Sequence, residues 1–284
     1  MTCGSLLVDE SSKGLQRGGS CTPTMAIVSA KGGVTDKLIA VVNAALTNME
    51  ESSQLLRVVA EEQIEVVRAI ANSERTDAAQ AMINADVEDI TMVLRAVSLV
   101  KTVPVTTMEL VTGYGEVWSA ITMHSYLASQ GVPSAWLDAR DVLVVEQTGG
   151  AGLGEKGSSN VMGTDPVWPA TQRRVDAWWA DAERDTLRNV DFSKEAPVVV
   201  VTGFVAATAE GTPTTLKRSG SDYSATIFAK LMAARSITMW KDVNGVYTAD
   251  PRRVPEAFPI SSLKFDEAIE LAFFGAQVCL GHHP

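Results

Sequence analysis

The run Pro197–Gly203, PVVVVTG, is the most apolar and β-branched stretch of the chain. A row of valines without alternating polar residues is typical of a strand that is buried on both faces. Such strands occur where other elements cover both sides of a sheet. The run therefore predicts a central strand in a sheet with no face open to water.

A second strand is predicted at Met25–Ala30, MAIVSA. Lys31–Gly33 ends it, and Val34–Leu46 then carries apolar residues at helical spacing. Strand, glycine turn and helix in this order form the unit of an α/β protein. Thr35 and Asp36 stand at the helix start, where a hydroxyl or carboxylate either caps the helix or contacts a ligand. Capping is the more common role for such a pair.

Three further helices are predicted at Ser53–Ile70, Asp77–Val100 and Gly115–Gln130. The last of them follows the glycine-containing segment Thr112–Gly115. Glu116 falls in its first turn, where an acid complements the positive end of the helix dipole. For Glu116 considered by itself, this structural role is the simpler interpretation.

The second half of the chain alternates between strands and helices. The predicted elements are strands Ala135–Leu137 and Val142–Val145, helix Thr171–Trp179, a hairpin of Phe204–Thr208 with Thr214–Leu216, helix Ser221–Ala234, strand Ile237–Trp240 and helix Phe265–Phe274.

A Gly/Ser-rich insertion is predicted at about residues 148–165. It contains Gly152–Gly157, GLGEKG, which satisfies the dinucleotide pattern G-x-G-x-x-G after a strand. In a dinucleotide fold a helix begins inside this pattern, whereas this segment continues through Ser158–Asn160 and reaches Pro166 first. We interpret it as a surface insertion, with nucleotide binding as the less favoured alternative.

The segment that follows the hairpin combines both signs of charge at a helix start. Lys217 and Arg218 precede Ser219–Asp222, whose hydroxyl and carboxylate groups suit a helix cap. A cationic pair beside a helix N-terminus favours a carboxylate or phosphate ligand. Asp222 instead suits an ammonium group, a metal or the orientation of a lysine. The two together indicate a zwitterionic or metal-phosphate ligand, and an ordinary capped helix is the alternative.

Composition excludes several classes of function. The net charge of −10 argues against a nucleic-acid-binding surface. The chain contains no apolar run of about eighteen residues, so no membrane span is predicted, and residues 1–24 lack the apolar core of a signal peptide. An odd number of cysteines fits a reducing compartment. No metal site is predicted, because metal-ligand spacing is absent among Cys3, Cys21, Cys279, His124, His282 and His283.

Several segments in one order resemble the catalytic domain of aspartate kinases, which belong to the amino-acid kinase family, and especially the kinase portion of bifunctional aspartokinase–homoserine dehydrogenases. The resembling segments are Ile27–Asp36, Gly113–Ser119, Leu137–Val145, Val201–Phe204, Pro213–Ala225, Trp240–Arg252 and Phe274–Val278. The resemblance implies a three-layer α/β/α fold around a mainly parallel sheet at residues 25–284, incomplete at both ends, with residues 1–24 outside it, either disordered or unrelated to the family.

The resemblance also implies a function. The expected reaction transfers the γ-phosphoryl group of ATP, with Mg²⁺, to the side-chain carboxylate of L-aspartate, the first step towards lysine, threonine and methionine. The expected setting is the cytoplasm or a plastid, in a homo-oligomer of the full-length protein, without nucleic acid or membrane as a partner.

By this likeness Arg218 holds the α-carboxylate of aspartate, Glu116 meets its ammonium group and Thr35 lines the same pocket. Ser221 and Asp222 match a family pair in which the aspartate orients catalytic groups. The residues that match nucleotide-contacting positions are Lys241, Asp242, Tyr247, Arg252 and Gln277.

One departure from the family bears on activity. Aspartate kinases carry a strand followed by Lys-Phe-Gly-Gly-Thr-Ser, whose glycines hold phosphates, and nothing in these 284 residues aligns to it. Lys13 and Arg17–Ser20 are only a faint echo of it. We expect the chain by itself to have weak activity or none. The alternatives are another kinase of the same family and a non-catalytic homologue that binds amino acid or nucleotide.

Overall fold

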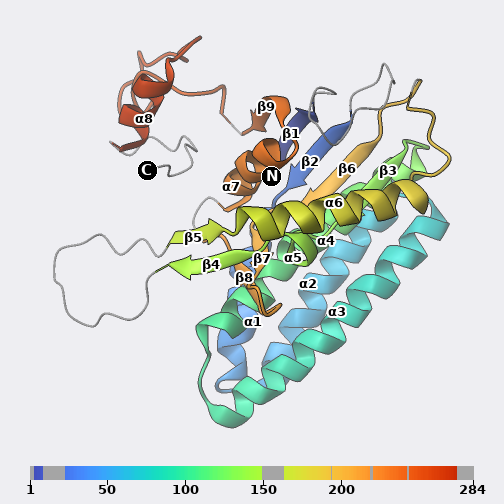
Figure 1. Ribbon diagram of the computed structural model, residues 1–284. Helices are drawn as coiled ribbons and strands as arrows, with labels where there is room; N and C mark the ends of the chain where they lie inside the picture. Colours follow the sequence, from blue (N-terminus) through green and yellow to red (C-terminus); the bar gives the residue numbers. More distant parts are fainter. Residues whose placement is uncertain are drawn as a thin grey trace.

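A five-stranded sheet forms the centre of the protein (Figure 1). The structure is a computed structural model that describes residues 3–8, 23–148, 163–192, 194–217, 220–241 and 243–273. The strands follow the order β3–β6–β2–β1–β9. Their bounds are β1 Cys3–Val8, β2 Thr24–Val28, β3 Ser134–Leu137, β6 Val198–Thr202 and β9 Ala234–Trp240.

The sheet is mainly parallel, as predicted. Strand β6 pairs in parallel with both β2 and β3, and Val199, Val200 and Val201 are fully buried. Strand β1 pairs antiparallel with β2 on one side and with β9 on the other. Strand β9 therefore runs in the same direction as β2. The sequence did not predict β1, which occupies part of the segment 1–24 that was expected to lie outside the domain.

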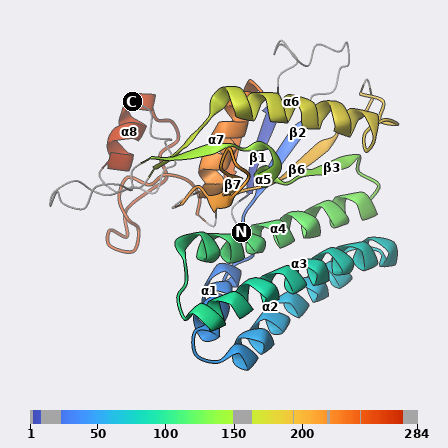
Figure 2. The same cartoon turned by 60° about the horizontal axis from the view of Figure 1, so that its bottom comes forward.

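Helices cover both faces of the sheet, which confirms the three layers. On one face α6 (Trp168–Arg184) and α7 (Gly220–Leu231) pack on a core that includes Met25 and Ile27. On the other face α4 (Val105–Ser129) packs on the sheet and against α1 (Val34–Ala45). The long helices α2 (Met49–Ile70) and α3 (Ser73–Val100) lie outside α1 and α4 and add a further helical layer (Figure 2).

Helix α4 begins ten residues before the predicted Gly115. Pro104 precedes it and the helix continues through Gly113 and Gly115. These glycines are sites of close packing, not a break. A Cβ at Gly113 would lie 2.8 Å from Cγ1 of Val205, and one at Gly115 would lie 3.1 Å from Cβ of Ala30. Only a residue without a side chain lets the helix approach its neighbours this closely.

The predicted strand Val142–Val145 is also wrong in its first part. Asp138 caps a short helix α5 (Ala139–Val142) by accepting a hydrogen bond from the backbone N–H of Arg140. Strand β4 (Val145–Thr148) follows and pairs antiparallel with β5 (Gly163–Pro166). These strands flank the predicted insertion, whose GLGEKG pattern lies outside the described residues.

The remaining predicted helices and strands are present, although the helix predicted at Ser221–Ala234 ends at Leu231 and Ala234 begins β9. Strands β7 (Val205–Ala207) and β8 (Pro213–Thr215) form the expected hairpin, and α8 (Phe265–Phe273) is the last described helix. Figure 1 shows the segment after β9 running away from the sheet towards α8. Within the described ranges no helix has the length and apolar character needed to cross a membrane.

Candidate active site

The carboxyl end of β2 is the meeting point of several predicted site residues. Gly203, which follows β6, donates its backbone N–H to the carbonyl oxygen of Val28 at 2.9 Å. A Cβ at Gly203 would lie 2.7 Å from that oxygen and 3.0 Å from Cβ of Ser221. The missing side chain thus lets the start of α7 rest against the ends of β2 and β6.

Glu116 approaches the same end of β2 from α4. Its side chain is buried, and the backbone N–H of Ala30 donates a hydrogen bond to its carboxylate. Its atom Oε2 has no hydrogen-bond partner in the described part of the chain. Burial raises the pKa of Glu116 to about 8, although the hydrogen bond from Ala30 lowers it. A buried carboxyl with one unused oxygen is costly unless a ligand group pairs with it.

Thr35 is positioned by the turn that follows β2. Gly33, the residue before α1, has a φ of 81°, which a glycine adopts without steric cost. Thr35 comes two residues later, in the first turn of α1, and is half-buried. The start of α1 with Thr35, Glu116 of α4 and Ser221 of α7 therefore belong to three different helices that pack near the end of β2.

Asp222 is joined to the end of β9. Its carboxylate is 9% exposed and accepts a hydrogen bond from Nζ of Lys241 at 2.5 Å. The register explains this contact, since Cys3 of β1 pairs with both Val28 and Trp240. The ends of β2 and β9 are therefore level and two strand spacings, or about 10 Å, apart. Lys241 can then reach the helix that rests on β2.

A buried acid that the sequence did not single out lies beside this site. Glu109 in α4 accepts a hydrogen bond from the hydroxyl of Thr214 at 2.7 Å and forms an ion pair with Nζ of Lys217. Glu109 and Thr214 are buried, and the side chain of Lys217 is 28% exposed. Lys217 is one of the two cations predicted to bind an anion. Its charge is balanced by Glu109 instead.

Two residues with left-handed backbone flank the β7–β8 hairpin. Phe204 has a φ of 67° and Lys217 a φ of 62°. The N–H of Phe204 donates to the hydroxyl of Ser224 in α7, and that hydroxyl donates to the carbonyl oxygen of Gly220. A Cβ at Gly220 would lie 2.4 Å from the ring of Phe204. The hairpin and the start of α7 therefore form one closely packed unit.

Lys241 contacts Asp222, whereas two other residues predicted to contact the nucleotide, Tyr247 and Arg252, make local contacts within their own segment. Arg252 pairs with Asp250 in its own segment and its side chain is 89% exposed. Tyr247 accepts a weak hydrogen bond from the side-chain amide of Asn244 at 3.5 Å and forms a β-bridge with Pro259. Three other predicted site residues, Arg218, Asp242 and Gln277, lie outside the described residues.

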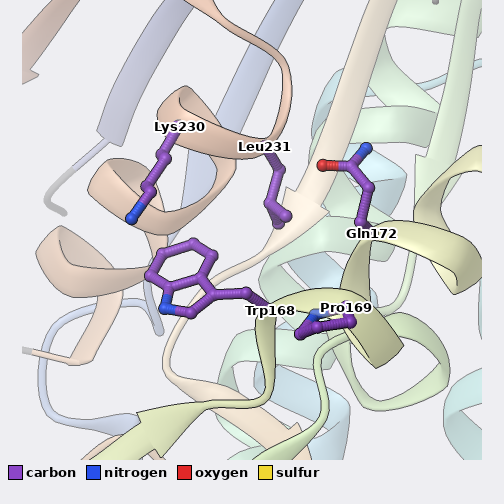
Figure 3. Close-up of a pocket in the computed structure, with 5 residues that line it drawn as sticks. All are labelled: Trp168, Pro169, Gln172, Lys230 and Leu231. Carbon is purple, nitrogen blue, oxygen red and sulfur yellow. The ribbon is translucent and has the colours of Figure 1, made fainter.

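A surface pocket lies at the other end of α7 (Figure 3). It has a volume of about 410 Å³ and is lined by Trp168, Pro169, Gln172, Lys230 and Leu231. Nζ of Lys230 lies 3.9 Å from the centre of the Trp168 ring. Lys230 and Asp222 are at opposite ends of the helix, so this pocket is separate from the predicted site.

The fold and the residues at the end of β2 define a class of protein. The sequence profile of the amino acid kinase family matches residues 7–281, and the chain belongs to that family. The chain is 34% identical over 262 residues to bifunctional aspartokinase/homoserine dehydrogenase 2, chloroplastic, of Zea mays, covering 92% of this chain and 26% of the maize protein. It is 33% identical to bifunctional aspartokinase/homoserine dehydrogenase 2 of Escherichia coli, covering 89% of this chain and 28% of that protein.

A solved structure agrees with the sequence relatives. The crystal structure of E. coli aspartokinase III in complex with aspartate and ADP (R-state) matches with a TM-score of 0.67 and 25% identity, over 89% of this chain and 50% of that one. The chain thus spans about a quarter of the length of these curated relatives and half of the solved structure. The family resemblance predicted from the sequence is confirmed.

Proposed function

We propose that this chain is the kinase portion of an aspartate kinase. The reaction is attack of a side-chain carboxylate oxygen of L-aspartate on the γ-phosphorus of ATP. One P–O bond forms, the bond to the β-phosphate breaks, and the products are 4-phospho-L-aspartate and ADP. The observation that carries the proposal is the buried, unpartnered Oε2 of Glu116 at the edge of the sheet where α7 also begins. The solved relative with bound aspartate and ADP supports the same choice of ligands.

The amino-acid substrate is assigned to the end of β2. Glu116 receives the ammonium group of aspartate, because its free carboxylate oxygen lacks a donor and an ammonium supplies both a donor and a balancing charge. Thr35 and Ser221 offer hydroxyls to the substrate carboxylates. Arg218 is the cation for the α-carboxylate, since the charge of Lys217 is balanced by Glu109 and a guanidinium holds a carboxylate with two parallel hydrogen bonds.

The phosphoryl path is assigned to Asp222 and Lys241. Phosphoryl transfer depends mainly on positioning and on cationic stabilisation of the equatorial oxygens. The ammonium of Lys241 supplies the cation, and Asp222 holds it in place by their ion pair. Asp242, Tyr247, Arg252 and Gln277 remain the proposed contacts to the nucleotide.

Mg²⁺ is expected to arrive with the nucleotide. This ion is usually held by one or two carboxylates together with substrate phosphates. No group of three or more His, Cys, Asp or Glu side chains that could hold a metal occurs among the described residues. Asp222 binds Lys241 on the assigned phosphoryl path, so its carboxylate is a protein group that fits such a shared site. The ion would neutralise charge on the transferring group.

The test is a hydroxamate assay with ATP and Mg²⁺, run in parallel with L-aspartate, L-glutamate, N-acetyl-L-glutamate and UMP. An acyl phosphate reacts with hydroxylamine, so aspartyl hydroxamate is the expected product, and ADP release reports UMP phosphorylation. Selective turnover of another acceptor would identify a different kinase of the family.

Binding is measured separately from turnover, because the chain contains no Lys-Phe-Gly-Gly-Thr-Ser segment. Calorimetry with aspartate and with ADP is run beside the hydroxamate assay. Binding without turnover supports the non-catalytic alternative. The absence of both binding and turnover would refute the proposal.

The cellular setting is proposed from the relatives alone. The maize protein is named as chloroplastic and the E. coli protein carries no such label, so a plastid or the cytoplasm fits. A homo-oligomer of the full-length protein is proposed from the resemblance to the family, and light scattering of the full-length protein tests it.

A further inference from the structure

Glu109 is an unusual residue for its place in the fold. Its carboxylate is 8% exposed, inside the surface where α4 packs on the β7–β8 hairpin. A carboxylate in such a place needs both a counter-charge and hydrogen-bond donors. Glu109 has both, from Lys217 and from Thr214. Neither the reaction nor the packing of apolar side chains requires an acid at this position.

Lys217 is equally unusual. It adopts a φ of 62°, a conformation in which a Cβ clashes with the backbone and which glycine adopts most readily. Strained residues of this kind persist where the surroundings hold them in place, and they occur often at functional sites. The ion pair with Glu109 holds Lys217. It fixes the left-handed backbone at a point three residues before Gly220, the first residue of α7.

The start of α7 is therefore restrained from two sides. Gly220 packs against the ring of Phe204 and against Leu216, and Leu216 donates its N–H to the carbonyl oxygen of Phe204 at 2.7 Å. The backbone has a left-handed conformation at Lys217, whose side chain is held by Glu109 of α4. We propose that Glu109 is a positioning residue, which holds Lys217 in its left-handed conformation and so fixes Ser221 and Asp222 at the end of β2.

This inference deepens the proposed function, because those positions matter for catalysis only if the chain binds aspartate there. Its structural part can be tested without any activity. Hydrogen exchange of the amides at 220–224 is measured in the wild-type protein, Glu109→Gln, Lys217→Gly and the double variant. Asp181→Asn is the control, since it breaks an exposed ion pair with Arg184 on α6.

Glu109→Gln is expected to speed exchange at these amides by about tenfold relative to Asp181→Asn, because the half-buried ammonium of Lys217 loses its counter-charge and releases the strained turn. In the double variant exchange should return to within about threefold of wild type, since glycine adopts the left-handed backbone without help. This non-additivity distinguishes positioning from general loss of stability. Exchange equal to that of Asp181→Asn, or a defect that persists in the double variant, would overturn the proposal.

Aspartate binding by calorimetry provides the functional arm. Glu109→Gln should weaken the affinity for aspartate about tenfold and Lys217→Gly should restore it in the double variant. Lower thermal stability with unchanged aspartate affinity would mean that Glu109 has only a structural role. Should the wild-type protein bind no aspartate, the proposed function fails, and the exchange measurements still decide whether Glu109 fixes the start of α7.

Discussion

The two sides of the proposed site are built in opposite ways. The side assigned to aspartate has the buried Glu116 and the half-buried Thr35 and Ser221. The helices that carry them are packed closely at Gly115, Gly203 and Gly220. The side assigned to the nucleotide is a segment after β9 whose bonds are mostly local, such as that between Arg252 and Asp250. The ion pair of Asp222 with Lys241 connects them.

This difference has consequences for how each side responds to change. A pocket built from core packing exists before its ligand binds, and it cannot be altered without disturbing the fold. A segment with exposed side chains and local hydrogen bonds can move at little cost. Substitutions on the aspartate side should therefore affect stability and binding together, whereas those on the nucleotide side should affect binding alone.

The largest effect is expected from Gly203→Ala. The new Cβ would lie 2.7 Å from a backbone oxygen of β2, and overpacking of this kind typically costs about 1–3 kcal/mol. We expect a lower urea midpoint and about a 100-fold loss of aspartate affinity, since displacements of about 1 Å can have effects of this size. Gly32→Ala is the control for stability, because a Cβ there meets nothing within 4 Å. If Gly203→Ala and Gly32→Ala were equally stable, the expectation that changes on the aspartate side lower stability would be wrong.

Asp222→Asn tests the connection between the sides. The amide keeps the shape but loses the charge that holds Lys241, so kcat should fall about 100-fold with a small change in stability, about 1 kcal/mol for a partly exposed pair. Lys241→Ala should lower kcat comparably and raise the KM for ATP more than that for aspartate. Steady-state kinetics on both variants checks this. An unchanged kcat in Asp222→Asn would show that the pair has no part in phosphoryl transfer.

The pKa of Glu116 predicts a dependence on pH that belongs to the aspartate side. Because this pKa is raised from 4.5 to about 8, the folded state binds a proton more tightly than the unfolded state. The stabilisation that comes from this proton on Glu116 is fully present below pH 4.5 and is lost as the pH rises towards 8. Glu116→Gln should therefore raise the thermal midpoint by several degrees at pH 8.5 and change it little at pH 5.

Ligand binding should show the opposite trend. Only the ionised form of Glu116 pairs with the ammonium group of aspartate, so the affinity for aspartate should increase as the pH rises towards 8. At pH 7 binding should also release close to one proton. Calorimetry in two buffers of different ionisation enthalpy measures that release. A constant affinity from pH 6 to 8 would contradict the assignment of Glu116.

The smallest effect is expected from Arg252→Ala. Its side chain is almost fully exposed, so the free energy of unfolding should change by no more than about 0.5 kcal/mol. If Arg252 contacts the nucleotide phosphates, the KM for ATP should rise about tenfold, which corresponds to about 1.4 kcal/mol. Asp250→Asn is the matched control, because it breaks the same ion pair but leaves the arginine. An equal change of the KM for ATP in both variants would mean that the segment around Arg252 matters and not its guanidinium.

Much of the fold could be predicted because the signals were local. The valines of β6 and the helical spacing in α1 each fix an element by themselves. The predicted helix start at Gly115 was wrong because α4 begins at Val105 and its glycines serve contacts with Val205 and Ala30, which are distant in the sequence. The strand predicted at 142–145 failed because the cap at Asp138 favours a short helix.

The site could be predicted only in part for the same reason. Glu116 was predicted as a substrate contact only through the resemblance to a family, since an acid in the first turn of a helix is not distinctive by itself. Asp222 was singled out from its own segment as a group that suits the orientation of a lysine, and it does bind Lys241. Glu109 was missed because its partners Thr214 and Lys217 follow more than a hundred residues later. The sequence did place an acid, Glu109, on the inner face of a helix. That pattern does not show which residue neutralises the acid.

The position of β6 between β2 and β3 also bears on how the protein folds. Thr24 pairs with Val198, so the centre of the sheet joins segments separated by roughly 170 residues. At about 5–20 residues per second a ribosome needs roughly ten seconds or more to make that length. During this time β2 has no β6 to pair with, and β3, which ends at Leu137, waits for roughly the last 60 residues of it. Folding should therefore be slow and sensitive to aggregation until β6 is inserted, and a chaperone present during synthesis should increase the yield of soluble protein.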